Sequence, residues 1–502
     1  MIENQKLSIP SLCPHGNHKL AMCKAPAMPG HKSRAEMEKI MKKRLLSLFM
    51  CGALTAALLG GCGNAQAPAE SAEPEMADAA GEAAEESASE EPAPEAASDD
   101  DKVITFWSIG TAEPDATILQ KAVDTFNETT TSGYKVELVN YPTDNYKEKI
   151  TIAMSSGECP DVYTNWTGGP LTEYIKAGFA QPITDKVKEY GLDQKVMASG
   201  LAQATVDGEV YGVPFLNIAI EGVYYNKELF DKFGLKEPAD LEELEAICDT
   251  FVENGITPFA LANASKWTGS MFFMGLATRH SGLEPFNAAF DGSGSFEDEC
   301  FEYAGNKIRE WVEKGYFPEG VNSLSFDDGQ DKQLFYQETA AMMVQGSWQT
   351  STFAEDSPEF FEKVGWFPFP EIKGSAADSS IQIGTVGDIF MTFNCTGEKL
   401  DAAMELCSHY FDDDAVAYAV EVGYLPPVQN IGELVSDEIS KKILDAAMNA
   451  STIQLWYDQY LPPAVSTVHQ NTCQELFGLS ITAEEADAEL QKSMEEYLAE
   501  SK

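Results

Sequence analysis

The sequence has few basic residues. Its 34 Lys and Arg stand against 81 Asp and Glu, which gives a formal net charge of -47. A surface that binds nucleic acid needs basic side chains to neutralise phosphates, so this balance argues against a nucleic-acid partner. Strong acidity also accompanies disorder, but 44% hydrophobic and 10% aromatic residues indicate a packed globule from about residue 102 onward. We therefore expect a globular protein with an acidic, solvated surface.

Motifs for cofactors and metals are also missing. None of the strands expected below is followed by a Gly-rich phosphate loop, which disfavours a nucleotide-binding fold. The six cysteines after Cys62 form no Cys-x-x-Cys pair, and His280, His409 and His469 are isolated from one another. The acidic loops 290–299 and 326–331 do not follow the EF-hand ligand order. We expect no resident cofactor, no metal and free buried thiols, although an even cysteine count in an exported protein permits disulfides.

The hydrophobic run at 45–59 is about fifteen residues long, below the roughly 20 that a membrane-spanning helix needs. It follows Lys42, Lys43 and Arg44, which is the pattern of a secretory signal peptide. The run ends at Gly60-Gly61-Cys62, which resembles the bacterial lipobox, in which the cysteine is lipidated and becomes the mature N-terminus. The alternative is a buried core helix that happens to contain Cys62.

A signal peptide normally opens the chain, so we expect 1–61 to be an upstream extension plus signal, with the true start at Met37 or Met41. The segment upstream of it holds a cluster of zinc-ligand residue types whose spacing fits no zinc pattern: Cys13, His15, His18 and Cys23. We assign it no metal.

Residues 62–101 follow the lipobox with thirteen acids, no base and no aromatic side chain. Such a composition cannot build a packed core, so we expect a disordered acidic tether. As a flexible coil it would span roughly 35 Å.

From residue 102 short β runs alternate with amphipathic helices, which predicts an α/β fold. Strands are expected at 102–108, 134–142 and 160–166, and helices at 115–130, 145–158 and 170–178.

Several segments in this part resemble a known family. They are "PDVYTNW", "EYIKAGFAQPI", "YGVPFLNIAIEGVYYNKELFDKFGL", "ETAAMMVQGSW", "VGWFPFPEIKG" and "YLPP". In order and spacing they are similar to the extracellular solute-binding proteins of ABC transporters, in the carbohydrate-binding branch that includes maltose-binding protein. The resemblance covers nearly all of 102 to about 495. The lipobox and tether fit it, because Gram-positive bacteria must moor such receptors with lipid.

The resemblance implies a two-lobed, periplasmic-binding-protein-like α/β fold of class II type, with a hinge and a ligand cleft between the lobes. We expect the chain to cross between lobes near 215–222, 384–388 and 449–455. The resulting lobe boundaries are 102–216 plus 388–452 for the N-terminal lobe and 217–387 plus 453–502 for the C-terminal lobe.

A sugar presents apolar C–H faces and hydroxyl edges, so its site needs flat aromatic rings and planar polar side chains. Four of the seven tryptophans fall where the family lines its cleft: Trp166, Trp267, Trp348 and Trp456. By contrast, Trp311 has amphipathic helix spacing and Trp366 lies in an expected strand, so both are predicted to be core residues.

Further ligand-binding candidates flank these tryptophans, although each could instead cap a helix, form a turn or pack a loop. They are Glu113, Tyr141, Asp161, Asn165, Glu221, Asp388, Tyr424 and Asp458. Asp388 lies in a glycine-flanked turn at an expected lobe crossing, where the backbone can approach a ligand. Asp161 belongs to the family's "PDV" segment and is as suited to orienting the loop as to touching ligand.

The favoured function is therefore a non-enzymatic receptor that binds a sugar or oligosaccharide and presents it to ABC permease subunits. We expect a monomer, lipid-anchored at the outer face of the cytoplasmic membrane of a Gram-positive-type bacterium. Two alternatives stay open: the same fold binding a non-sugar solute such as a polyamine or metal, and a secreted glycoside hydrolase.

Overall fold

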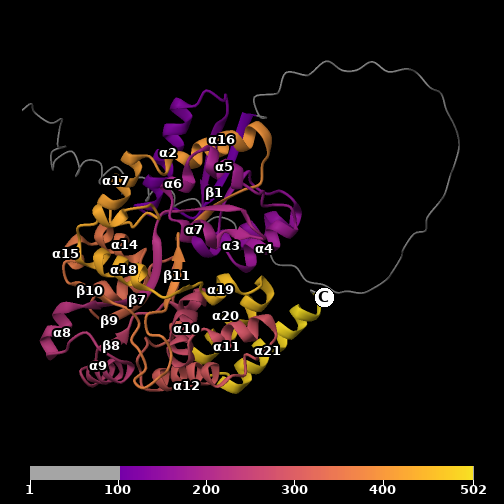
Figure 1. Cartoon of the computed structure of the whole chain (residues 1–502). Coiled ribbons are helices and arrows are strands. Elements are labelled where there is room, and N and C mark those ends of the chain that lie inside the picture. Colours follow the sequence, from indigo (N-terminus) through magenta and orange to yellow (C-terminus); the bar gives the residue numbers. More distant parts are fainter. Residues whose placement is uncertain (1–101, 501–502) are drawn as a thin grey trace, which may run out of the picture. The chain divides into compact units, whose positions relative to one another are not determined.

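The computed structural model describes residues 102–500, where helices surround two separate β-sheets (Figure 1). The expected start sites Met37 and Met41, the signal peptide, Cys62 and the acidic tether lie outside the described residues. Among the described helices, none has the length and apolar character needed to cross a membrane.

The first sheet has five strands in the order β2-β1-β3-β12-β6. Its strands are β1 (Val103–Ser108), β2 (Lys135–Asn140), β3 (Val162–Asn165), β6 (Gly212–Phe215) and β12 (Ile389–Phe393). Strand β1 is parallel to β2 and β3, whereas β12 is antiparallel to β3 and β6.

The chain segments that build the first sheet also carry eight helices and a small hairpin of the described part. They are α2 (Asp115–Thr129), α3 (Thr143–Ser156), α4 (Gly169–Lys176), α5 (Thr184–Glu189), α6 (Leu192–Lys195), α7 (Ala198–Gln203), β4 (Thr205–Val206), β5 (Glu209–Val210), α16 (Gly397–His409) and α17 (Asp413–Glu421). The opening order of strand, helix, strand, helix, strand, helix is confirmed, and every predicted end lies within two residues of the observed one.

The second sheet is built around β7 (Ile218–Asn226), in which all nine residues are buried. Its other strands are β8 (Thr257–Phe259), β9 (Ala340–Gly346), β10 (Val364–Phe367), β11 (Gln382–Val386) and β13 (Ile453–Gln454). The strand order is β13-β11-β7-β9-β8, and β10 also pairs with β7.

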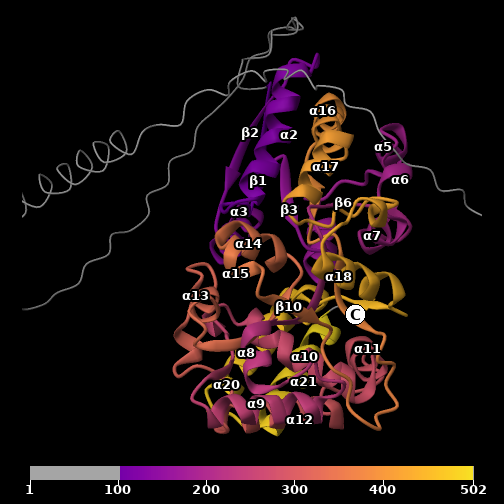
Figure 2. The same ribbon diagram turned by 90° about the vertical axis from the view of Figure 1, so that its left-hand side faces the viewer.

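The remaining α-helices of the described part are α8 (Lys227–Phe233), α9 (Leu241–Glu253), α10 (Trp267–Ser281), α11 (Glu284–Asp291), α12 (Glu299–Glu313), α13 (Gln330–Tyr336), α14 (Gln349–Asp356), α15 (Pro358–Phe361), α18 (Glu438–Asn449), α19 (Tyr457–Tyr460), α20 (Pro463–Phe477) and α21 (Ala483–Glu500). Three short 3-10 helices, η2 (Asn263–Ser265), η3 (Val321–Ser323) and η4 (Ile431–Glu433), complete the fold. In both views α14 and α18 lie at mid-height, while α9, α12, α20 and α21 gather at the end opposite α2 and α16 (Figures 1 and 2).

Helix α10 lies in the core of the part that is built around the second sheet, because every residue from Thr268 to Arg279 is buried. It packs against both α12 and α20. A helix that is buried on all sides lies inside a core. This packing fixes its first residue, Trp267, at the edge of the core.

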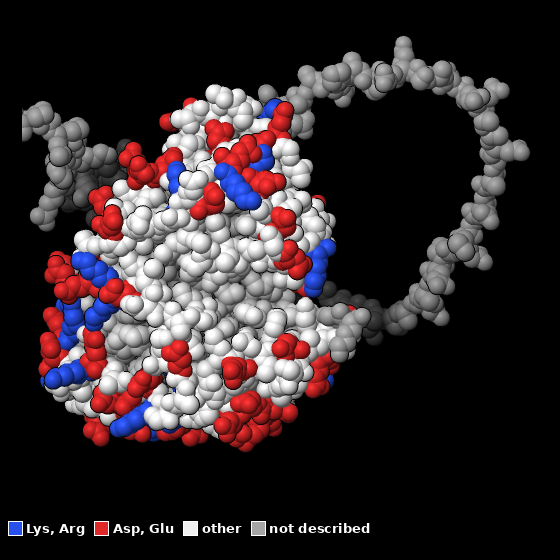
Figure 3. Space-filling view, in the orientation of Figure 1, with Lys and Arg blue, Asp and Glu red and all other residues white. Residues whose placement is uncertain are grey.

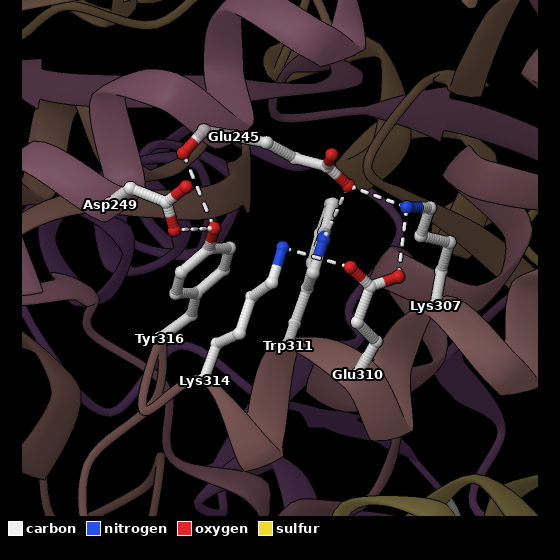
Figure 4. A network of polar contacts seen from close by, with 7 residues as sticks. All are labelled: Glu245, Asp249, Lys307, Glu310, Trp311, Lys314 and Tyr316. Carbon is white, nitrogen blue, oxygen red and sulfur yellow. Dashed lines mark hydrogen bonds and ion pairs between the residues drawn. The ribbon is translucent and has the colours of Figure 1, made fainter.

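Trp311 and Trp366 are fully buried in α12 and β10, which confirms the prediction that they are core residues. Figure 4 shows how the polar edge of Trp311 is satisfied: its Nε1 donates to Glu245 of α9 at 2.8 Å. Lys307 bridges the same carboxylate and Glu310, at 2.9 Å each. This network joins α9 to α12 around the buried indole.

The connection between the sheets is clamped by Asn217, which lies between β6 and β7 and is buried. Its side-chain oxygen accepts from the Leu425 amide at 2.7 Å, and its carbonyl accepts from the Asp388 amide at 2.6 Å. Gly387, with φ of 126°, precedes Asp388, and a Cβ there would lie 2.3 Å from the Cβ of Pro214. Three distant chain segments are thereby tied together where the chain passes from one sheet to the other. The lobe boundaries given above stay a prediction.

The surface carries many acidic side chains, as the composition predicts. On the face shown in Figure 3, Asp and Glu side chains are spread over both ends, whereas the centre of this face carries few charged side chains.

The six cysteines of the described residues are unpaired, and five of them are buried.

Candidate functional site

A cavity of about 220 Å³ lies between the loops that leave the two sheets. Ile109 and Trp166 enter it directly after β1 and β3, and Trp348 enters it after β9. Loops at the carboxyl ends of strands are where open α/β sheets place their ligands. The cavity is therefore in the position that the fold favours for a binding site.

Three tryptophans form a continuous aromatic wall. The ring centroid of Trp348 lies 6.1 Å from that of Trp267 and 5.4 Å from that of Trp456, with interplanar angles of 66° and 56°. The Trp348 ring folds back over Gly346, where a Cβ would lie 2.1 Å from the indole. Glycine at this position is what allows the ring to lie there, and the wall offers flat apolar surface to a ligand.

Trp166 lines the same cavity but follows β3 of the first sheet. The ammonium of Lys147 lies 5.0 Å from the Trp166 ring and 5.6 Å from the Trp267 ring, so it bridges aromatic groups of both halves. Its charge is balanced by Asp458, whose side chain is mostly buried and whose carboxylate lies 3.5 Å from Nζ. Such a cation between rings is held electrostatically.

Two carboxyl groups make up another part of the wall. Asp115 lies in the first turn of α2, and Asp388 lies in the turn between β11 and β12. The hydroxyl of Tyr424 donates to Asp115 Oδ1. Burial, and then the charge of Glu113, raises the pKa of Asp115 to about 7. Burial, and then the charge of Asp115, raises the pKa of Asp388 to about 8.

No basic side chain of the described part contributes to either of these pKa values. The second lysine of the cavity, Lys332, is paired with Asp356 at 2.7 Å. The pair Asp115 and Asp388 is therefore available to accept hydrogen bonds from a ligand.

Seven of the twelve candidates predicted from the sequence line this single cavity. They are Trp166, Trp267, Trp348, Trp456, Asp388, Tyr424 and Asp458. Their ligand contacts stay a prediction, but residues up to about 290 positions apart in the chain are brought to one place.

The other five candidates do not line the cavity, for different physical reasons. Asp161 accepts from the amide of Thr105 at 3.0 Å and pairs with Lys399 at 3.1 Å, so it holds β1, β3 and α16 together. Tyr141 packs its ring edge on Trp107 at 5.4 Å. Asn165 is buried opposite Phe390 in the first sheet.

Glu113 is exposed to solvent and acts on the cavity only through its charge, which raises the pKa of Asp115. Glu221 is buried in β7 and lies outside the cavity lining.

Other residues that line the cavity were not predicted from the sequence, including Asp115, Lys147, Asp327 and Lys332. Asp115 carried a usable signal, because it begins the helix that follows the first strand, and that turn borders the ligand site in α/β folds. The lysines carried none, since a helix-surface lysine has the same local pattern whether it faces solvent or a cavity.

No group of three or more His, Cys, Asp or Glu side chains suited to a metal ion occurs within residues 102–500.

Comparison with known proteins gives a match over residues 110–417 to the family model described as bacterial extracellular solute-binding protein. The chain is 25% identical over 345 residues to a multiple sugar-binding protein of Streptococcus mutans, covering 64% of this chain and 77% of that protein.

Solved structures are similar as well. One comes from work on xylan utilization by the thermophilic bacterium Caldanaerobius polysaccharolyticus, with 28% identity and a TM-score of 0.70, covering 78% of this chain and 99% of that one. A chitin oligosaccharide binding protein has 25% identity and a TM-score of 0.73, covering 79% and 99%. The expected two-lobed periplasmic-binding-protein-like α/β fold is confirmed.

Proposed function

This chain belongs to the bacterial extracellular solute-binding proteins, and from that premise we propose that it is the sugar receptor of an ABC transporter. It binds a sugar or oligosaccharide in the tryptophan-lined cavity, closes around it, and delivers it to permease subunits. Catalysis of solute hydrolysis is not part of this function.

The observation that carries the proposal is the composition of the cavity wall. Trp166, Trp267, Trp348 and Trp456 surround one space together with the carboxyl groups of Asp115 and Asp388. Aromatic faces pack against the C–H faces of a pyranose, and carboxyl oxygens accept hydrogen bonds from its hydroxyl groups. A cavity with both kinds of surface matches the two kinds of edge that a sugar presents. The sugars named for the Streptococcus relative and for the chitin-binding structure support the same class.

A lipid anchor at Cys62 completes the proposal. The short hydrophobic run, the glycine pair before Cys62 and the acidic stretch after it support a receptor moored to the outer face of the cytoplasmic membrane of a Gram-positive-type bacterium. Each buried methylene of an acyl chain contributes about 0.8 kcal/mol, so two or more chains give a lasting anchor. We propose that the receptor works as a monomer.

The test of binding is a thermal-shift screen of the purified chain with neutral oligosaccharides, followed by calorimetry on each sugar that raises the melting temperature. In Trp348→Ala we expect at least tenfold weaker binding, since the variant loses the buried apolar area of the ring together with about 0.5–1.5 kcal/mol for the aromatic contact. The matched control is Trp107→Ala, which removes an indole that lies outside the cavity lining. Equal affinity in the wild type and Trp348→Ala would remove the aromatic wall from the site.

The test of the anchor is Cys62→Ser in cells that carry the full chain. We expect the variant to appear in the medium or the soluble fraction, while the wild type stays with the membrane and takes up labelled palmitate. Full membrane retention of Cys62→Ser would contradict lipid anchoring. It would leave the binding proposal intact.

A further inference from the structure

Glu221 is a buried carboxyl group with no conventional partner. It lies in the middle of β7 opposite Gly346 of β9, and the residue is 2% exposed. A Cβ on Gly275 of α10 would lie 3.1 Å from its Oε1, so the carboxyl group packs directly on that helix. Neither of its oxygens accepts a hydrogen bond from the described residues. Buried polar atoms are rarely left so, and each such case calls for an explanation.

Two groups face this carboxyl group. The guanidinium of Arg279 lowers the pKa of Glu221 by its charge, but its Nε and Nη1 donate to the carbonyls of Phe369 and Ile381, at 3.0 and 2.7 Å. The second group is the indole N–H of Trp456, which also lowers the pKa of Glu221. Burial outweighs both and raises that pKa to about 8.

The indole N–H of Trp456 is itself buried and without a partner at hydrogen-bond geometry. A donor and an acceptor thus face each other inside the protein, and neither is satisfied. A hydrogen bond between them would satisfy both atoms, and in a low-dielectric interior such a bond is worth more than in water.

The other side of Trp456 belongs to the cavity, where its ring packs beside Trp348. A sugar that stacks on this ring would contact it from the cavity side. We propose that Glu221 is a positioning residue for sugar binding, which accepts a hydrogen bond from the Trp456 indole when solute stacks on that ring and so fixes the ring plane. This inference rests on the proposed sugar-binding function, and it replaces direct solute contact as the role of Glu221.

The test is a double-mutant cycle on Glu221 and Trp456, with maltotriose, xylotriose and triacetylchitotriose as probes in calorimetry. Glu221→Leu removes the acceptor at similar volume, and we expect up to about tenfold weaker binding, the size of one buried hydrogen bond. Glu221→Gln keeps a carbonyl acceptor and should bind within about twofold of the wild type. In a Trp456→Phe background, Glu221→Leu should have no further effect. Melting temperatures are measured in parallel, because replacing an unpartnered buried carboxyl group by leucine is neutral or stabilising for the fold.

Wild-type affinity in Glu221→Leu would overturn the inference. So would an equal loss of affinity in the Trp456→Phe background, because Glu221 would then act by another route. A loss of affinity that is accompanied by a lower melting temperature would assign Glu221 a structural role instead.

A sugar-free measurement separates this inference from the proposed function. In protein labelled with ¹⁵N-tryptophan, the Trp456 indole resonance, assigned through Trp456→Phe, should move between pH 6 and 9 as Glu221 ionises. The movement should be absent in Glu221→Gln. Arg279 is the charged group of the described part that faces Glu221, and it does not titrate in this range. An unmoved resonance would show that the two side chains do not interact, whereas failure of all three sugars to bind would contradict the proposed function.

Discussion

Replacing Asp388 by Asn should stabilise the sugar-free protein at neutral and alkaline pH. Burial and the neighbouring Asp115 raise the pKa of Asp388 from 3.8 to about 8, with no offsetting base among the described residues. A carboxyl group whose pKa is higher in the folded state than in the unfolded state holds its proton better when folded. Its contribution to stability is therefore complete below about pH 4 and is lost as the pH rises through about 8. Asparagine cannot ionise, so the variant escapes this loss.

The size of the effect follows from the two pKa values. At about 1.4 kcal/mol per pH unit, the difference between 3.8 and about 8 sets an upper limit of about 6 kcal/mol above pH 8. Asp388 keeps some contact with cavity water and can share a proton with Asp115, which reduces the cost of ionisation. We expect a gain of about 2 kcal/mol at pH 8.5, or roughly 3 °C in melting temperature, and no gain at pH 4.

The assay is thermal unfolding of the wild type and Asp388→Asn at pH 4, 6, 7 and 8.5 without sugar. The matched control is Asp458→Asn, because Asp458 is ion-paired with Lys147 and its loss should not stabilise at any pH. Asp388→Asn should also weaken sugar binding about tenfold, since one of the two carboxyl oxygens is replaced by an NH₂ group that cannot accept a hydrogen bond. A gain that is equal at all four pH values, or a net loss at pH 8.5, would refute the reasoning.

The remaining predictions concern two other positions, Gly169 and His469. In Gly169→Ala the new Cβ would lie 2.1 Å from the carbonyl oxygen of Leu461, so sugar affinity should fall at least tenfold as these two segments are pushed apart. Gly432→Ala, whose Cβ would meet only a side chain at 3.6 Å, is the control, and equal affinities of the two variants in calorimetry would contradict this. Burial lowers the pKa of His469 to about 3, so its contribution to stability is present above pH 6.5 and is lost as the pH falls toward 3. At pH 7 His469→Gln should be about 1 kcal/mol less stable than the wild type in urea unfolding, because the hydrogen bond to Ser270 is weakened. Between pH 6.5 and 4.5 the variant should lose less stability than the wild type. Equal losses in the two proteins over this range would refute the prediction.

The opening of the fold was predictable because its signals are local. Asp115–Thr129 has apolar residues at helical spacing and follows a short β run, and the observed helix buries Leu119, Val123 and Phe126 on that face. The core assignment of Trp311 rested on the same periodicity. The family segments added what periodicity lacks, which is the expectation that Trp166, Trp267, Trp348 and Trp456 meet.

Long-range contacts set the limit of the sequence-based prediction. Asp161 has a partner 238 positions away in Lys399, and nothing in the segment "PDV" shows that its carboxylate turns toward that lysine and not toward a ligand. Glu221 lies in β7, none of whose residues lines the cavity, and no local pattern distinguishes its carboxyl group from one that reaches a ligand; only the packing against α10 shows where it lies.

The same physics explains why the site is recognisable in the structure. A fold that was optimised for stability alone would pair Asp115 and Asp388 with a base, give the indole N–H of Trp267 an acceptor, and keep tryptophan rings out of a water-accessible cavity. These departures occur together at one place and are held there by rigid elements: α10, the glycine under Trp348 and the clamp at Asn217. Such a loss of stability is expected where the proposed binding site keeps hydrogen-bonding capacity free for a solute. Asp388→Asn tests this trade-off directly, because one substitution should raise the melting temperature and lower the affinity.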